Sequence, residues 1–237
     1  MKYIEHIIEP EKLLLSWQPS DPSDRGRAIV AELHRNGDDA DLVYLRETSE
    51  FIRAKNKGFE EYPGLPDIDN KNYSSVLSVF MRRLPPHHRK DFDKFLEAIR
   101  IRPQTGISDF ALLGYAGGRL PGDDFTIIHP FDRAEPPFEL LLLVTGYRYY
   151  QQKNPYDKIQ VGMSARFEIE PENQYDPNAV RILIPEDSTD TAGYVCRGLL
   201  PQFRKWMESG FKLNATVERK NGATDQPLIY LFVEVRA

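Results

Sequence analysis

The sequence predicts an α+β protein, with a small α+β domain at residues 1–135 followed by a β-barrel-like domain with one helix at 136–237. Two observations predict this class. Strand-like segments dominate both ends of the chain, while helical periodicity is confined to its middle and to one stretch near residue 200. A charged, proline-containing segment at 131–137 precedes the strongest apolar strand signal, at 138–145, so we place the domain boundary there.

Residues 12–130 have the pattern of strands, two helices and a final strand. Residues 12–17 and 28–34 have strand-like composition and flank a polar loop at 18–25, as the arms of a β-hairpin do. A third short strand is expected at 42–45, and apolar residues at helical spacing predict helices at 73–83 and 87–99, separated by Pro85 and Pro86. Glycines punctuate 114–122, where we expect turns, and the domain closes with a strand at 125–128.

The C-terminal half has a mostly strand-like pattern. One helix is expected at 199–209, ending at Gly210. Five or six short strands with one helix indicate a small antiparallel barrel or sandwich. The expected strands are 140–150, 165–170, 179–185, 191–195, 211–219 and 228–235.

The composition excludes several classes of protein. With 41% hydrophobic and 28% charged residues among 237, the chain resembles soluble globular proteins, and its longest apolar run, 140–144, is too short to span a bilayer. The amino terminus has no apolar secretion signal, and the single cysteine, Cys196, suits a reducing compartment, so we expect a cytoplasmic protein. The formal net charge of −5 argues against extended binding to duplex nucleic acid but permits a local pocket for one strand end.

Three sequence blocks in the C-terminal half carry a family resemblance. They are VTGYRYY at 144–150, EPENQYDPNAV at 170–180 and GYVCR at 193–197. In this order and spacing they resemble the HIRAN domain, which occurs in DNA-repair helicases and in many bacterial proteins. The second block is the most specific, although Gln174 stands where proline is usual. The resemblance covers residues 139–237.

The resemblance implies a barrel-like fold related to the oligonucleotide-binding architecture, which in the best-known members binds single-stranded DNA at a free 3′ end. It places six residues in the nucleic-acid-binding groove: Arg148, Tyr149, Asn173, Tyr175, Asp176 and Arg197. Aromatic faces stack on any base, and arginine pairs with phosphate. A carboxylate repels backbone phosphate, so Asp176 fits best where it accepts a hydrogen bond from a terminal hydroxyl.

The same residues also have purely structural interpretations. If 140–150 is one strand, alternation sends Tyr147 and Tyr149 to one face and Tyr150 to the other, and one of these faces is core. The stretch 173–178 is rich in turn-forming residues, so Asp176 could serve only to stabilise a tight turn. Both roles stay open for these residues.

Residues 12–130 more weakly resemble the small N-terminal subdomain of HipA-type toxin kinases. The motifs are RAIVAEL at 27–33, VFMRRLP at 79–85 and FALLG at 110–114, and it is their order that gives the match weight. The catalytic machinery of that family lies in a larger part that these residues do not include. The sequence also shows no metal-ligand set, catalytic triad or intact phosphate-binding loop. We therefore expect no enzyme activity, no catalytic residues, no metal and no cofactor.

Two hypotheses follow. In the first, a non-enzymatic protein joins a HIRAN-like reader of single-stranded DNA 3′ ends to a HipA-like interaction domain, with a separately encoded HipA-like kinase as a possible partner and DNA-end or damage sensing as the input. In the second, the chain is a protein-interaction or antitoxin-like regulatory subunit of a HipA-type toxin–antitoxin system and does not bind DNA. The acidic net charge favours the second hypothesis.

Overall fold

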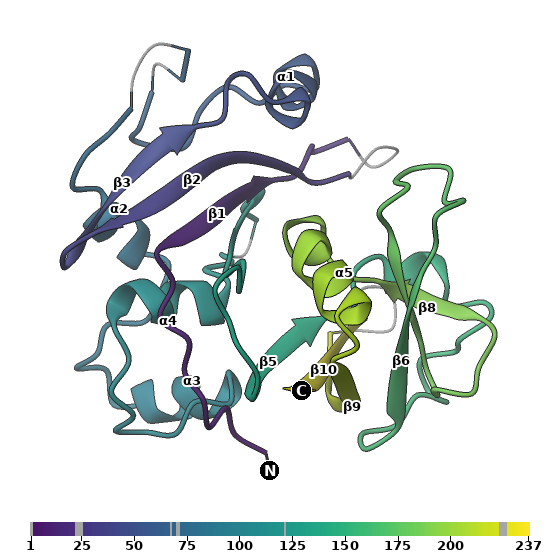
Figure 1. Cartoon of the computed structure of the whole chain (residues 1–237). Helices are drawn as coiled ribbons and strands as arrows, with labels where there is room; N and C mark the ends of the chain where they lie inside the picture. Colours follow the sequence, from purple (N-terminus) through teal and green to yellow (C-terminus); the bar gives the residue numbers. More distant parts are fainter. Residues whose placement is uncertain (1, 22–25, 67, 70–71, 121, 223–226) are drawn as a thin grey trace. The chain divides into compact units, whose positions relative to one another are not determined.

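A computed structural model describes residues 2–21, 26–66, 68–69, 72–120, 122–222 and 227–237 (Figure 1). The chain forms two compact units. One is Ile8–Arg133, and the other is Ala134–Ala237 together with the N-terminal residues up to Ile7. None of the helices in these ranges is long and apolar enough to cross a membrane. That 1–135 and 136–237 are separate domains, each with its own fold, stays a prediction.

The N-terminal unit is built on a four-stranded antiparallel sheet (Figure 1). Its strands, in spatial order, are β3 (Asp39–Tyr44), β2 (Ala28–Asn36), β1 (Lys12–Trp17) and β4 (Phe125–Ile128). β1 and β2 pair from Lys12↔His34 to Trp17↔Ala28, which confirms the predicted hairpin. Residues 22–25 of the polar loop expected between them lie outside the described residues.

Two predicted helices of this unit are shorter than the periodicity indicated. α2 (Leu77–Met81) begins late, because Tyr73 pairs with Leu42 of β3 and the Asp39 carboxylate accepts a hydrogen bond from the Leu77 amide at 3.0 Å. α3 (Phe92–Ala98) follows a run of turns at residues 87–91, which the sequence had predicted to be part of the helix. Tertiary pairing and turn geometry override helical spacing at both sites.

Two helices were not predicted. α1 (Ser49–Asn56) begins at the Thr48 hydroxyl, which accepts a hydrogen bond from the Phe51 amide. α4 (Asp109–Ala116) begins at Ser108 in the same way and contains Gly114, which we expected in a turn. A Cβ on Gly114 would lie 2.5 Å from Leu13 Cδ2, so this glycine allows the helix to pack closely on the sheet.

The C-terminal unit contains a six-stranded antiparallel sheet curled into a half-barrel, with one helix, α5 (Leu200–Glu208) (Figure 1). The strands, in spatial order, are β5 (Phe138–Leu143), β10 (Leu228–Arg236), β9 (Lys212–Asn221), β6 (Ser164–Ile169), β7 (Val180–Leu183) and β8 (Thr191–Tyr194). The sheet curls enough for Thr145, just after β5, to form a bridge with Tyr194 on β8, the opposite edge strand. The predicted α+β class, with a barrel-like sheet and one helix in the second half, is confirmed.

The core of the C-terminal unit lies between α5 and the curled sheet. Phe203 and Trp206 of α5 are almost fully buried and make ring contacts with each other, with Phe167 and with Phe138, at centroid separations of 5.0 to 5.1 Å. Burying aromatic side chains of this size provides much of a domain's hydrophobic stabilisation. The helix therefore holds the two halves of the curved sheet at a fixed spacing.

A buried carboxylate ties the N-terminal residues to this unit. Glu139 on β5 accepts hydrogen bonds from the backbone amides of Glu5 and His6 at 3.0 and 3.2 Å, and it pairs with Arg236 at 2.8 Å. Its side chain is only 3% exposed. Burial raises the pKa of Glu139, but the hydrogen bonds from the His6 side chain, Arg236 and the two backbone amides together outweigh it and lower the pKa below its usual value. The carboxylate therefore stays ionised and fixes the chain terminus to the sheet.

Candidate nucleic-acid interface

The segment after β5 is not a continuation of the strand, as the sequence had suggested. Gly146 adopts a positive φ of 77°, and Tyr147–Tyr149 then form a short 3-10 helix. The alternation prediction is therefore wrong: Tyr147 is 2% exposed, whereas Tyr149 is 63% exposed. The Tyr147 hydroxyl donates to the Asn154 carbonyl at 2.6 Å, and burial raises the pKa of Tyr147 to about 12. Tyr147 is a structural anchor, and it fixes the turn that carries Tyr149.

Tyr149 and Arg148 form an exposed cation–aromatic pair. The Arg148 guanidinium lies 4.5 Å from the centre of the Tyr149 ring and donates a hydrogen bond to the Tyr149 hydroxyl. An exposed aromatic face beside a cation can stack on a base and attract a phosphate together. The structure thus brings together the first two predicted site residues.

Asn173 organises the turn that carries the other predicted residues. Its side-chain oxygen accepts from the backbone amides of Tyr175 and Asp176 at 3.0 and 3.1 Å. The Asp176 carboxylate in turn accepts from the Asn178 amide at 2.9 Å. These bonds are those of Asx-type turns. One oxygen of Asp176 therefore has the structural role considered from the sequence, and Asn173 has such a role as well. The same turn leaves the Tyr175 side chain 83% exposed.

Asp176 and Arg197 lie together. Arg197, at the start of a second 3-10 helix (Arg197–Leu199), places its guanidinium 3.3 Å from the second Asp176 oxygen. Both side chains are roughly three-quarters buried. One Asp176 oxygen thus bonds the turn and the other faces Arg197, so this cation orients the carboxylate and partly neutralises it.

Tyr194 connects the two groups of site residues and was missed as a site residue. Its hydroxyl donates to Glu170 at 2.9 Å, and the Asn173 amide lies 3.2 Å from the same hydroxyl and 2.6 Å from Glu170. The ring also lies 5.7 Å from that of Tyr150, in the segment that carries Tyr149. Burial, with hydrogen bonds to Tyr150 and Glu170, raises the pKa of Tyr194 far above its usual value, so the hydroxyl stays protonated.

Gly193 explains how β8 reaches the segment after β5. A Cβ at this position would lie 2.6 Å from Val144 Cγ1 and 2.7 Å from the Thr145 carbonyl oxygen. Those distances are too short for any other residue without a backbone shift, and the Thr145–Tyr194 bridge depends on this approach. The glycine in the GYVCR block could therefore have indicated a close backbone contact.

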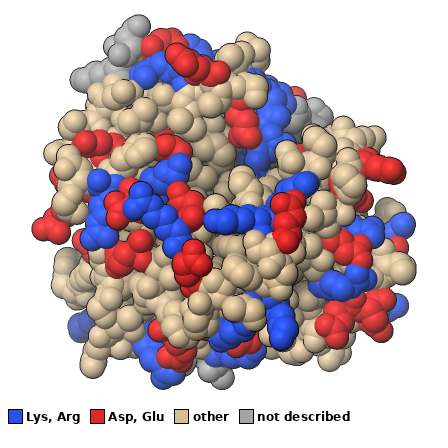
Figure 2. All heavy atoms as spheres, in the orientation of Figure 1, with Lys and Arg blue, Asp and Glu red and all other residues tan. Residues whose placement is uncertain are grey.

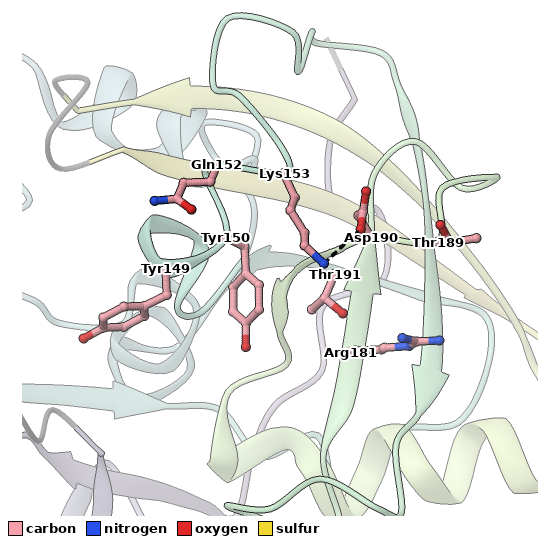
Figure 3. Close-up of a pocket in the computed structure, with 8 residues that line it drawn as sticks. All are labelled: Tyr149, Tyr150, Gln152, Lys153, Arg181, Thr189, Asp190 and Thr191. Carbon is pink, nitrogen blue, oxygen red and sulfur yellow. Dashed lines mark ion pairs between the residues drawn. The ribbon is translucent and has the colours of Figure 1, made fainter.

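A pocket of about 360 Å³ lies beside Tyr149 (Figure 3). Its lining residues are Tyr149, Tyr150, Gln152, Lys153, Arg181, Thr189, Asp190 and Thr191. Figure 3 shows the Lys153 ammonium directed at Asp190, at 3.5 Å, while Arg181 on β7 pairs with Glu168 at 2.8 Å. Neither Lys153 nor Arg181 was predicted as a site residue. Lys153 lies in the same turn as Tyr150, whereas Arg181 is brought to this pocket by the pairing of β7 with β8.

The charge distribution agrees with a local rather than an extended interface. Figure 2 shows positive and negative side chains interspersed over the visible face, with no broad basic area. No group of three or more His, Cys, Asp or Glu side chains in the described ranges could hold a metal ion. The arrangement offers aromatic faces, two or three cations and one oriented carboxylate, which is the chemistry of a small pocket for a nucleotide.

Comparison with known proteins finds similarity in this half of the chain. The family model of the HIRAN domain matches residues 138–235. Among solved structures, the HIRAN domain of human HLTF is 19% identical with a TM-score of 0.33, covering 41% of this chain and 74% of that one. A Lactobacillus plantarum protein is 23% identical with a TM-score of 0.34, covering 41% and 92%. No curated protein sequence matches this chain.

The match includes all three motif blocks recognised in the sequence, and it does not reach residues 12–130. These comparisons therefore give no support to the HipA-like resemblance of the first half, which stays a prediction from sequence. The matched region comprises the half-barrel, α5, and the two turns that present Tyr149 and Tyr175. Residues 138–235 of this chain form a HIRAN domain.

Proposed function

We propose that this HIRAN domain binds the free 3′ end of single-stranded DNA at the surface formed by Tyr149, Tyr175 and Asp176. The observation that carries the proposal is the exposure of the two tyrosines. At 83% and 63%, Tyr175 and Tyr149 are the most exposed of the large hydrophobic residues described. Both come from turns fixed by internal hydrogen bonds. Aromatic faces held in this way lose little conformational entropy when a base stacks on them.

Asp176 supplies the preference for an end. Its carboxylate is held by the Asn178 amide and by Arg197, so its position is set before any ligand arrives. A fixed negative charge disfavours a phosphate that continues the strand, while it can accept a hydrogen bond from a 3′ hydroxyl. Arg197 reduces this repulsion. Its guanidinium can also pair with the phosphate that joins the terminal nucleotide to the preceding one.

The pocket beside Tyr149 suits the neighbouring nucleotide. Its volume of about 360 Å³ lies within the range of small-ligand sites. Lys153 pairs with Asp190 at 3.5 Å, but its side chain is 72% exposed. Because exposed ion pairs of this kind are weak, a phosphate can compete for the ammonium. Tyr150 adds a second aromatic edge to the same wall.

We further propose that the protein is non-enzymatic and that its footprint on DNA is short. The net charge of −5 supports a short footprint, since each additional phosphate contact would need a further cation. The other hypothesis from the sequence is a protein-interaction or antitoxin-like regulatory subunit of a HipA-type kinase system that does not bind DNA. Capture of such a kinase by the full chain, with no DNA binding, would replace the present proposal.

The proposal is tested by titrating the full chain into fluorescent single-stranded octanucleotides with either a 3′ hydroxyl or a 3′ phosphate. We expect at least tenfold tighter binding to the 3′ hydroxyl strand, because the phosphate meets Asp176. A strand with a blocked 5′ end should bind as tightly as the unblocked strand. Equal, negligible binding to all strands contradicts DNA recognition, and equal, tight binding contradicts recognition of the end.

A further inference from the structure

A second hollow lies in the N-terminal unit, at the turn between α2 and α3. Its volume is about 540 Å³, which is also within the range of ligand-binding pockets. We call it the arginine groove. Its lining residues are Arg82, Arg83, Leu84, Pro85, Pro86, Arg89, Asp91, Lys94, Phe95 and Leu120.

Arg83 forms the fixed base of the arginine groove. Its side chain is only 2% exposed and donates to the Tyr62 hydroxyl and to the Gly118 carbonyl, each at 2.7 Å. It also pairs with Asp123. These interactions satisfy the guanidinium group of Arg83, and they attach the turn after α2 to the rest of the unit. Pro85 and Pro86 follow with restricted backbone angles, so the wall of the groove is preorganised.

The exposed charges of the groove are mainly positive. Arg82, Arg89 and Lys94 are exposed at its rim, and Asp91 is the one acidic residue of the lining. Arg89 pairs with Asp91 at 2.6 Å. Within the described part of the chain, no ion pair within 4 Å involves Arg82 or Lys94, although Lys94 lies close enough to Asp91 to help lower the pKa of that carboxyl. This local cationic rim favours an anionic ligand, although the net charge of −5 on the whole chain acts in the opposite direction.

The floor of the groove is apolar and is suited to an aliphatic side chain. Leu84 and the partly exposed Pro85 lie beside Phe95, and Leu120 is 40% exposed. Phe95 offers little free face for a base, because it is partly buried and its ring packs 5.7 Å from that of Phe92. The groove therefore differs from the tyrosine surface of the HIRAN domain, which has the exposed rings that nucleic-acid stacking needs.

We propose that the arginine groove binds an acidic peptide segment of a partner protein. Glu or Asp side chains of the segment pair with Arg82 and Lys94, and one aliphatic side chain packs between Pro85 and Leu120. Clusters of basic residues recognise acidic motifs in this way, and the buried apolar contact adds affinity that charge alone does not give. This site is separate from the proposed DNA site and does not depend on it.

The test uses the full chain and a fluorescent octapeptide of Glu and Asp residues with two central Leu residues. We expect saturable binding that weakens at least tenfold in the double variant Arg82→Glu with Lys94→Glu. The matched control, Lys57→Glu with Lys212→Glu, changes the net charge equally at exposed positions outside the groove and should leave the affinity within twofold. Equal weakening in both variants, or no binding to the wild type, overturns the proposal.

Three further arms identify the ligand class and separate this site from the HIRAN surface. Replacing the two Leu residues of the probe by Ser should weaken binding severalfold, because the apolar floor then has no partner. Tyr149→Ala should leave peptide binding unchanged. If a single-stranded oligonucleotide displaces the peptide, and the groove variant loses affinity for both, the groove is a nucleic-acid site and the peptide proposal is wrong.

Discussion

The C-terminal unit contains two kinds of polar side chain. Glu139, Tyr147 and Tyr194 are largely enclosed, and each is bonded to other parts of the same unit. Tyr149 and Tyr175 come from neighbouring segments of chain, yet they project most of their rings into solvent. Tyr147 and Tyr194 hold the turns that carry the exposed rings, whereas Glu139 holds the N-terminal residues against β5.

Folding stability and binding affinity are therefore expected to depend on different side chains of this unit. Truncating an enclosed group leaves its partner unsatisfied and costs folding stability. Truncating an exposed ring removes little from the folded state but removes a surface on which a base can stack. The two groups should therefore respond oppositely in stability and in binding measurements, and the following variants test this.

The largest expected effect is on folding, at Gly193. Gly193→Val forces a side chain against Val144 and the Thr145 carbonyl, so we expect the free energy of unfolding to fall by about 3 kcal/mol. The measurement is urea denaturation followed by circular dichroism. Gly106→Val is the control, since a Cβ there meets nothing within 4 Å, and it should change stability by less than about 0.5 kcal/mol.

The next effect is the pH dependence at Glu139. Because its pKa is lowered in the folded state, the carboxylate adds stability above the unfolded pKa of about 4.3, and this stability is lost as pH falls through the folded pKa. Glu139→Gln should destabilise the protein by about 2 kcal/mol at pH 7 and flatten the loss of stability in acid. Thermal unfolding from pH 7 to pH 3 measures both. An unchanged acid profile in the variant contradicts the assignment.

A smaller effect, on binding alone, is expected at Tyr149. Tyr149→Ala should weaken single-stranded DNA binding about tenfold, or about 1.4 kcal/mol, from the loss of one stacking surface. Because the ring is 63% exposed, the melting temperature should hardly change. Tyr149→Phe should keep most of the affinity, since it keeps the ring. A variant that loses stability instead of affinity places Tyr149 among the structural residues.

The smallest effect is expected at Tyr194. Tyr194→Phe keeps the ring but removes the hydroxyl that bonds Glu170 and Asn173, so we expect a loss of about 1 kcal/mol in stability. The DNA affinity should fall by less than in Tyr149→Ala. If Tyr194→Phe weakens binding more strongly than that variant, the hydroxyl contacts the ligand and the division into enclosed and exposed groups is wrong at this position.

Much of the fold could be predicted from local patterns. Strands such as 12–17 and 125–128 were located correctly, because their apolar and β-branched residues match a half-buried pleated sheet. The stretch at 144–150 also contains β-branched and aromatic residues, but the positive φ of Gly146 and the hydrogen bond from Tyr147 to Asn154 make it a turn. Gly114 was placed in a turn because its helical role depends on close packing against Leu13.

The candidate site was predictable to a similar degree. The turn-forming residues at 173–178 and the exposed Tyr149 and Tyr175 follow from local chemistry together with the family motif. That Arg197 lies against Asp176, and that Tyr194 joins the two blocks, depends on strand pairing between distant segments. Neither the spacing nor the residue types carry that information.

In the proposed function, Tyr149 and Tyr175, from two separate turns, form one surface for the 3′ end of a strand, so both rings should act on the same terminal nucleotide. A double-mutant cycle measures this directly, using the affinities of wild type, Tyr149→Ala, Tyr175→Ala and the double variant for a single-stranded octanucleotide with a 3′ hydroxyl. We expect a coupling free energy of about 1 kcal/mol, because rings that stack on one nucleotide do not contribute independently. Strict additivity would mean that the two rings bind separately, and unchanged affinity in all three variants would contradict the account.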